Sequence, residues 1–308
     1  MRILRDRNAI PSDARGASAA IGNFDGVHLG HQAVIDLARR TGSALGVVTF
    51  EPHPREWFVH DGPAFRLMNP QAKAHRLQRL GVETLFELRF DAALATLSPE
   101  AFVREVLARD LGLSHAVVGA DFHFGKGRAG SAGTLRDLGR EVGIEVTVAP
   151  MLELEAGEVS STAIRTALSE GRPRDAARML GHWHRIEGPV LHGEKRGREL
   201  GYPTANLSIA GLHPPRFGVY AVKVDVLDGP HAGSYGGASS IGVRPMFAGE
   251  VANCETFLFD FAGDLYGATL SVALIDYLRP EMTFDGLPAL IRQMDADSLR
   301  AREILAHA

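Results

Sequence analysis

Residues 18–40 read SAAIGNFDGVHLGHQAVIDLARR, and this stretch decides the fold of the first half of the chain. A short, continuously apolar run at 18–22 is followed by a glycine-rich turn and then by a helical pattern near 29–41. Short runs that are apolar throughout are typical of strands buried on both faces of a parallel sheet. The sequence therefore predicts a doubly wound α/β domain, with its ligands at the carboxyl ends of the strands.

The same alternation of apolar run and helical pattern continues to about residue 148. Further strands are expected at 45–50, 84–88, 116–119 and 144–148. Helical patterns lie between them near 70–80, 98–111 and 134–142. Ser98 and Pro99 are suited to cap and begin a helix. Glycines that would end the helices follow the patterns at Gly42, Gly81, Gly112 and Gly143.

The second half of the chain has a different pattern. Residues 219–226, VYAVKVDV, alternate with the period of two that is typical of a half-buried strand. Further β-rich segments follow, and only 286–305 has helical spacing. We expect a small, mostly-β barrel closed by a C-terminal helix, with one domain spanning residues 1–180 and the other 181–308.

Composition excludes several classes of protein. The chain has 308 residues, 33 Lys plus Arg against 37 Asp plus Glu, and 7% aromatic residues. A net charge of -4 and so few aromatic residues argue against a protein whose main function is to bind nucleic acid. No apolar stretch reaches the ~20 residues of a membrane span, and the N-terminus lacks the core of a signal peptide. The single cysteine, Cys254, fits a reducing compartment, so we expect a cytoplasmic protein without nucleic-acid or membrane partners.

His28 and His31 lie three residues apart where the first helix is expected to begin. Both side chains can project from the same face of its first turn. A helix N-terminus offers unpaired N–H groups and positive potential, which makes it an anion site. Two imidazoles there can donate hydrogen bonds to phosphate oxygens, while Gly22 and Gly30 let the phosphates approach the backbone.

The full string GNFDGVHLGH resembles the motif of nucleotidylyl transferases with an H-x-G-H element, and specifically that of the bacterial bifunctional riboflavin kinase/FAD synthetase family. Three other segments agree with the resemblance, namely TFEPHP at 49–54, VGADFHFGKGRAG at 118–130 and VSSTAIRTAL at 159–168. All four follow or lie near expected strand ends, where a doubly wound sheet binds its ligands.

The resemblance implies roles for residues of the first domain. It implies His28, His31 and Arg165 as charge-stabilising catalytic groups. It implies ATP and phosphate binding by Gly22, Asn23, Phe24, Asp25, Gly30, Ser161 and Thr162, and flavin binding by His53, Asp121, Phe122, Phe124 and Arg128. Simpler roles remain open at this point: Asp25 can fix the turn, His53 can act as a wedge between prolines, the phenylalanines can be core, and the serines can cap a helix.

Residues 186–207, IEGPVLHGEKRGRELGYPTANL, resemble the riboflavin kinase motif of the same family. A glycine-rich basic loop can surround phosphates with N–H groups, and the resemblance implies ATP binding by Gly193, Lys195, Gly197, Arg198, Gly201 and Pro203. Thr204 and Asn206 are two apart, so in an extended segment their oxygens face the same way and suit magnesium. The family has its catalytic glutamate before an Asp-Leu-Tyr-Gly turn, which implies Glu255 as general base; a plain strand residue is the alternative.

The implied enzyme phosphorylates riboflavin to FMN and then transfers AMP from a second ATP to FMN, giving FAD and pyrophosphate, with Mg²⁺ at both steps. One departure is Met246, where the family usually has threonine. Three alternatives are an enzyme with one live site, a flavin carrier without turnover, and a transferase acting on tRNA. An enzyme with one live site is disfavoured because no motif residue apart from Met246 is missing. The phosphate-handling histidines and the Thr/Asn pair argue against a carrier, and the charge and the lack of an aromatic-basic surface argue against a transferase acting on tRNA. The sequence does not decide the oligomeric state, and self-association remains open.

Overall fold

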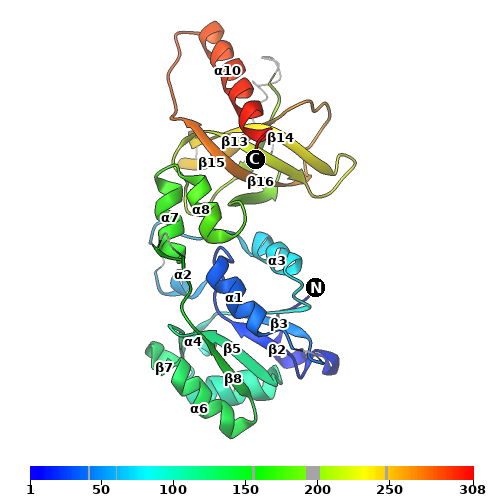
Figure 1. The fold of residues 1–308 in the computed structure, drawn as a ribbon, viewed down its shortest axis with the longest axis vertical. Coiled ribbons are helices and arrows are strands. Elements are labelled where there is room, and N and C mark those ends of the chain that lie inside the picture. Colours follow the sequence, from blue (N-terminus) through cyan, green and yellow to red (C-terminus); the bar gives the residue numbers. More distant parts are fainter. Residues whose placement is uncertain (41, 60, 155–156, 192–201, 247–248) are drawn as a thin grey trace. The chain divides into compact units, whose positions relative to one another are not determined.

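The computed structural model describes residues 1–40, 42–59, 61–154, 157–191, 202–246 and 249–308 (Figure 1). The chain divides into two compact units. The first unit comprises residues 1–62 and 73–159, and the second comprises residues 63–72 and 160–308. Helix α8 (Pro173–Leu180), which precedes the expected domain boundary at residues 180 and 181, belongs to the second unit.

The first unit contains a six-stranded sheet in the order β1-β4-β3-β2-β5-β8, and all its neighbouring strands are parallel. Because β3 and β4 extend the sheet to one side of β2 while β5 and β8 extend it to the other, the strand order reverses at β2. This confirms the predicted doubly wound fold and makes the carboxyl end of β2 the expected ligand position. The strands are β1 (Arg2–Leu4), β2 (Ser18–Ile21), β3 (Leu45–Glu51), β4 (Thr84–Arg89), β5 (His115–Gly119) and β8 (Glu145–Ala149).

Each of the four helical patterns predicted in the first half of the chain corresponds to a helix, but several short helices of this unit were not predicted. The pattern at 98–111 is a short turn of α-helix, α5 (Pro99–Ala101), capped by the Ser98 hydroxyl and continued by a π-helix, η3 (Phe102–Asp110). The short strand β1 has no counterpart among the predictions. The remaining helices are η1 (Arg7–Ala9), η2 (Ser12–Ala14), α1 (Leu29–Leu37), α2 (Pro54–Phe58), α3 (Pro70–Arg79), α4 (Ala92–Ala95), η4 (Lys126–Arg128) and α6 (Ala132–Val142).

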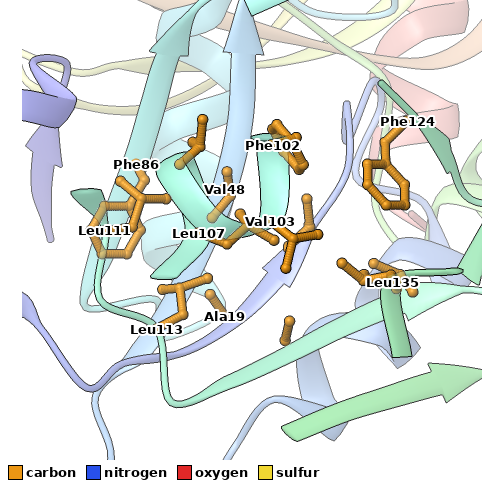
Figure 2. Close-up of a cluster of buried hydrophobic side chains, with 14 of the residues drawn as sticks. Ala19, Val48, Phe86, Phe102, Val103, Leu107, Leu111, Leu113, Phe124 and Leu135 are labelled. Atoms are coloured by element: carbon orange, nitrogen blue, oxygen red, sulfur yellow. The ribbon is translucent and has the colours of Figure 1, made fainter. Parts of the chain in front are cut away.

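The π-helix η3 supplies much of the core on one face of this sheet (Figure 2). Its Phe102, Val103 and Leu107 pack with sheet residues such as Val48 and Phe86. Burying side chains of this size contributes about 1.5–3 kcal/mol each, so this layer holds the strands in fixed positions. The loops at the carboxyl ends of the strands are therefore mounted on a rigid support.

The second unit contains an antiparallel six-stranded sheet in the order β11-β16-β13-β14-β15-β12. An antiparallel bridge between Leu191, just after β11, and Asn206 in β12 links the two edges and nearly closes the sheet into a barrel. The predicted small barrel is confirmed. Its strands are β11 (Arg185–Pro189), β12 (Thr204–Ser208), β13 (Gly218–Val226), β14 (Gly233–Met246), β15 (Gly249–Leu258) and β16 (Thr269–Arg279).

The barrel core consists of the side chains that the alternating pattern predicted. Tyr220, Val222, Val224 and Val226 of β13 are buried, whereas Lys223 is partly exposed. The predicted C-terminal helix is α10 (Leu287–Leu305), which packs against β13 and β14 (Figure 1). Two further helices of this unit precede the barrel in sequence, α7 (Ser161–Ser169) and α8.

Because His184 is buried, we expect the stability of the second unit to decrease at acidic pH. Burial first, and then the nearby His182 and His213, lower the pKa of His184 to about 3. An unfolded chain binds a proton to this side chain below about pH 6.5, whereas the folded chain does so only near pH 3. The free energy of unfolding should therefore fall as the pH drops through this window, by up to about 1.4 kcal/mol per pH unit from His184 alone.

The measurement is denaturant unfolding between pH 7 and 4, followed by the fluorescence of Trp183 in a Trp57→Phe background, since the chain has two tryptophans. His184→Gln should flatten the dependence of the unfolding free energy on pH, whatever it does to stability at pH 7. The matched control is the same substitution at His307, which is exposed. An unchanged slope in His184→Gln would mean that His184 does not cause the acid sensitivity.

Candidate active sites

The turn that joins β2 to α1 has an unusual backbone. Phe24 and Val27 have positive φ angles of 51° and 44°, and Gly26 has one of 86°. Both non-glycine side chains are almost fully buried, so core packing holds them in this conformation. Non-glycine residues with positive φ are uncommon and persist where the surrounding structure fixes them, often at functional sites.

His28 is the N-cap of α1, and its ring lies against that of His31. The two ring centroids are 3.6 Å apart and the rings are nearly parallel. The backbone N–H of His31 donates to Nδ1 of His28 over 3.3 Å. An imidazole that accepts at Nδ1 carries its proton on Nε2, so in its neutral form His28 donates through Nε2. The prediction that both histidines share the first turn of the helix is confirmed.

His31 is held in its neutral form. Its pKa lies well below the usual value, because of burial first and then the positive charges of His28 and Lys73. Among the described residues, nothing hydrogen-bonds to its buried Nδ1. An anion that approached these rings would favour their charged forms, so anion binding here would be coupled to protonation.

Gly22 and Gly30 make room for aromatic rings. A Cβ at Gly22 would lie 3.3 Å from the ring of Phe24, and one at Gly30 would lie 3.2 Å from the ring of His28. These glycines therefore allow the two rings to approach the backbone closely. That is a packing reason for both glycines, in addition to the phosphate contact that the sequence suggested.

Lys73 is part of this site and did not stand out in the sequence. Its ammonium group lies 2.7 Å from Oε1 of Glu51 and 3.0 Å from Oγ1 of Thr49. The signal that could have revealed it is its helical position. Lys73 lies one turn before Leu77, on a stripe that otherwise faces the core.

The residues expected to contact the flavin differ in their surroundings: some have structural roles or are buried, and others are exposed. His53 caps α2 in a reciprocal capping box with Glu56, so a structural role accounts for its position. Phe124 in β6 (His123–Phe124) is buried and packs against Phe102, whereas the neighbouring ring of Phe122 is partly exposed. Asp121 and Arg128 are exposed on the same loop, which β7 (Gly130–Ser131) closes by pairing with β6.

Ser161, Thr162 and Arg165 belong to the second unit and are described within it. They lie in the first two turns of α7, whose N-cap is Ser160. Nε of Arg165 donates to the carbonyl oxygen of Phe65 over 2.6 Å, and its guanidinium lies over the Phe65 ring. Ser160 thus caps a helix, which was one of the two interpretations that the sequence left open for these serines.

The second unit brings together three predicted residues of the kinase site. Asn206 in β12 lies directly opposite Glu255 in β15, and Thr204 lies opposite Phe257 two positions along. Ala205 and Leu207 are buried, so Thr204 and Asn206 share the other, more open face of β12. Nδ2 of Asn253 donates to Oε1 of Glu255 over 3.2 Å. A hydroxyl and an amide oxygen on one open face fit a hard cation such as Mg²⁺.

Tyr202 lies beside this face and connects it to α10. Its ring packs edge-on against Phe257 at 4.8 Å, and its hydroxyl donates to Asp295. Burial and the Asp295 carboxylate raise the pKa of Tyr202 to about 12.

Other residues singled out in the kinase sequence are less informative. Pro203, which follows Tyr202, is exposed, and Met246 is the last residue of β14. Five predicted ATP contacts lie outside the described residues: Gly193, Lys195, Gly197, Arg198 and Gly201.

Comparisons with known proteins match both halves of the chain. The FAD synthetase family model matches residues 10–163, and the riboflavin kinase family model matches residues 180–305. The bifunctional riboflavin kinase/FMN adenylyltransferase of Pseudomonas fluorescens is 42% identical over 99% of this chain and 98% of its own length. The protein of the same description from Escherichia coli K12 is 36% identical over 98% and 97%.

One solved structure shares the fold over nearly the full chain. It is a crystal structure described as a macrolide-efflux protein from Streptococcus pneumoniae, with a TM-score of 0.81, 31% identity and 98% coverage of both chains. Within the described part of our chain, no helix has the length and apolar character that a membrane span requires.

The parallel nucleotide-binding sheet and the small barrel together define a two-domain transferase of flavin cofactor synthesis. The two family models match one domain each, and the curated relatives match both at once. The chain belongs to the bifunctional riboflavin kinase/FMN adenylyltransferase family.

Proposed function

We propose that the two activities of this enzyme, phosphorylation of riboflavin and adenylylation of FMN, use separate residues in the two domains. The functional boundary in this proposal lies between residues 180 and 181. The observation that carries the kinase assignment is the pairing of Asn206 with Glu255, which are far apart in sequence and lie opposite each other on neighbouring strands. The stacked His28 and His31 support the transferase assignment.

In the kinase reaction, the 5′-hydroxyl oxygen of riboflavin attacks the γ-phosphorus of ATP and ADP leaves. Glu255 takes the hydroxyl proton, and Asn253 helps to orient its carboxylate by donating to Oε1. Thr204 and Asn206 would hold Mg²⁺, which neutralises charge on the ATP phosphates when bound. ATP binding is assigned to Pro203 together with Gly193, Lys195, Gly197, Arg198 and Gly201.

In the transferase reaction, a phosphate oxygen of FMN attacks the α-phosphorus of ATP and pyrophosphate leaves. No covalent intermediate with the protein is needed, so catalysis consists of positioning and neutralising charge. His28 and His31 donate to the phosphate oxygens, and Arg165 adds a positive charge. Phosphate binding is assigned to Gly22, Asn23, Phe24, Asp25, Gly30, Ser161 and Thr162, and flavin binding to His53, Asp121, Phe122, Phe124 and Arg128.

The proposed partners are small molecules only: riboflavin, FMN and ATP. Phe122 is the aromatic residue of the flavin loop with exposed area, whereas Phe124 supports it from the core. With a net charge of -4, nucleic acid is not a proposed partner, and the proposed location is the cytoplasm.

A fragment that begins at Gly181 tests the separation of the two sites. The buried core of the barrel is drawn from residues 186–274, so the fragment keeps it complete. We expect the fragment to make FMN from riboflavin and no FAD from FMN. A second fragment that begins at Ser160 retains α7 and α8 and should behave in the same way. If both fragments fold and neither makes FMN, the kinase site depends on the first domain and the proposal is wrong.

A further inference from the structure

Helix α3 places a lysine in the interior of the first unit, directly behind the proposed phosphate-binding turn. The side chain of Lys73 is 2% exposed. Its ammonium group contacts three oxygens, which are Oε1 of Glu51 at 2.7 Å, Oγ1 of Thr49 at 3.0 Å and the carbonyl oxygen of Asn23 at 3.4 Å. An ammonium group has three N–H donors, and these oxygens of the described residues are acceptors for them.

These contacts tie the start of the turn to the sheet. Asn23 lies two residues after the end of β2, while Thr49 and Glu51 belong to the end of β3. The Thr49 hydroxyl also donates to the carbonyl oxygen of Asn23, over 3.2 Å. Lys73 and Thr49 therefore hold the same carbonyl, at the residue where the chain enters the strained segment that ends at His28.

Fold stability alone does not account for a charge at this position. Burying an ammonium group is costly, and a well-packed apolar side chain of similar length is often as stabilising as a buried ion pair. The charge also acts beyond these contacts, because Lys73 is, after burial and the neighbouring His28, a further cause that lowers the pKa of His31. His28 lies beside His31 at the start of α1, and Glu51 forms an ion pair with Lys73.

We propose that Lys73 is a positioning residue for adenylyl transfer, which acts through the Asn23 carbonyl and through His31 rather than by touching the reactants. This inference rests on the assignment of His28 and His31 to the transferase site. Lys73, together with Thr49, fixes the Asn23 carbonyl and thereby where the turn places the two imidazoles.

The test is Lys73→Met in the full-length enzyme. We expect kcat for FAD formation from FMN and ATP to fall roughly 10- to 100-fold, since small displacements of positioning groups have effects of this size. With one cation removed, His31 should titrate at a higher pH, so the pH at which kcat/KM changes should move upward. Lys73→Arg keeps the charge and should restore the wild-type pH profile, even where kcat stays reduced.

Two controls separate this role from a merely structural one. Riboflavin phosphorylation by the same variant should remain at the wild-type rate, because it uses the other domain. Arg40→Met removes a cation from an exposed ion pair with Glu145 in the same unit and should leave adenylylation unchanged. If Lys73→Met fails to fold, Lys73→Met/Glu51→Gln removes both buried charges together and provides the same measurement.

The possible outcomes decide the proposal. A reduced kcat with a displaced pH profile, corrected by Lys73→Arg, supports it. Wild-type kcat in a folded variant, or a loss of the same factor at every pH, overturns it and makes Lys73 a residue of the core. A wild-type enzyme that makes no FAD would instead overturn the proposed function, so the two failures are distinguishable.

Discussion

Replacing both His28 and His31 by alanine is expected to lower FAD formation from FMN and ATP by roughly 10³-fold or more. Removing one pre-positioned donor to a developing charge typically costs 10²–10³ in rate, and this variant removes two. The two effects need not add, because the rings stack on each other and one caps the helix that carries the other. The measurement is the initial rate of FAD and pyrophosphate release at saturating ATP.

The same preparation provides the main control for the histidine variant. Riboflavin phosphorylation should stay within about twofold of wild type, because the kinase groups lie in the other domain. Asp36→Ala, on the exposed side of the same helix, should leave both reactions unchanged. Wild-type rates of FAD formation in the double variant would remove the histidines from the mechanism.

Glu255→Gln should reduce FMN formation from riboflavin by about 10²–10⁴, the usual contribution of a positioned general base. Glutamine has nearly the same shape and can still hydrogen-bond the substrate hydroxyl, but it cannot take its proton. The loss should therefore appear in kcat, with little change in riboflavin binding.

A paired assay separates loss of the base from misfolding. When supplied with FMN and ATP, Glu255→Gln should make FAD at the wild-type rate. Glu303→Gln, which changes an exposed carboxylate of α10, is the matched control and should retain both activities. Loss of both activities in Glu255→Gln would indicate a folding defect, and full kinase activity would make Glu255 an ordinary strand residue.

Local patterns in the sequence were sufficient to predict most elements of both domains. Five parallel strands and the helices between them follow from short apolar runs, capping residues and terminal glycines. At Ser98, for instance, a cap followed by proline marks the start of α5 correctly. The alternation along β13 predicts which of its side chains enter the barrel, because the period of two is a direct consequence of strand geometry.

Features that depend on pairing between distant segments were not predictable in the same way. Asn206 and Glu255 were each predicted as site residues from separate motifs. That they lie opposite each other on β12 and β15 depends on how the barrel assembles. From the sequence of α3 alone, Lys73 would be assigned to the solvent-exposed face of an amphipathic helix. Its burial depends on Glu51 and Thr49 of β3, which no pattern within the helix can reveal.

The packing around the two glycines and around Phe124 could also not be predicted from the sequence. The glycines in the first turn suggested close approach of phosphate, whereas the structure places the Phe24 and His28 rings against them. Phe124 resembled a ligand contact because it lies on a loop, yet it is part of the core beneath that loop. Side-chain directions in irregular segments follow from tertiary packing, which spacing along the chain does not encode.

The most direct test of the whole account is a time course of the wild-type enzyme with riboflavin, ATP and Mg²⁺, in which flavins are separated by chromatography. FMN should appear first and FAD should follow after a lag, with one ADP per FMN formed and one pyrophosphate per FAD. Without ATP, neither product should form. Recovery of unchanged riboflavin from the complete mixture would contradict the account.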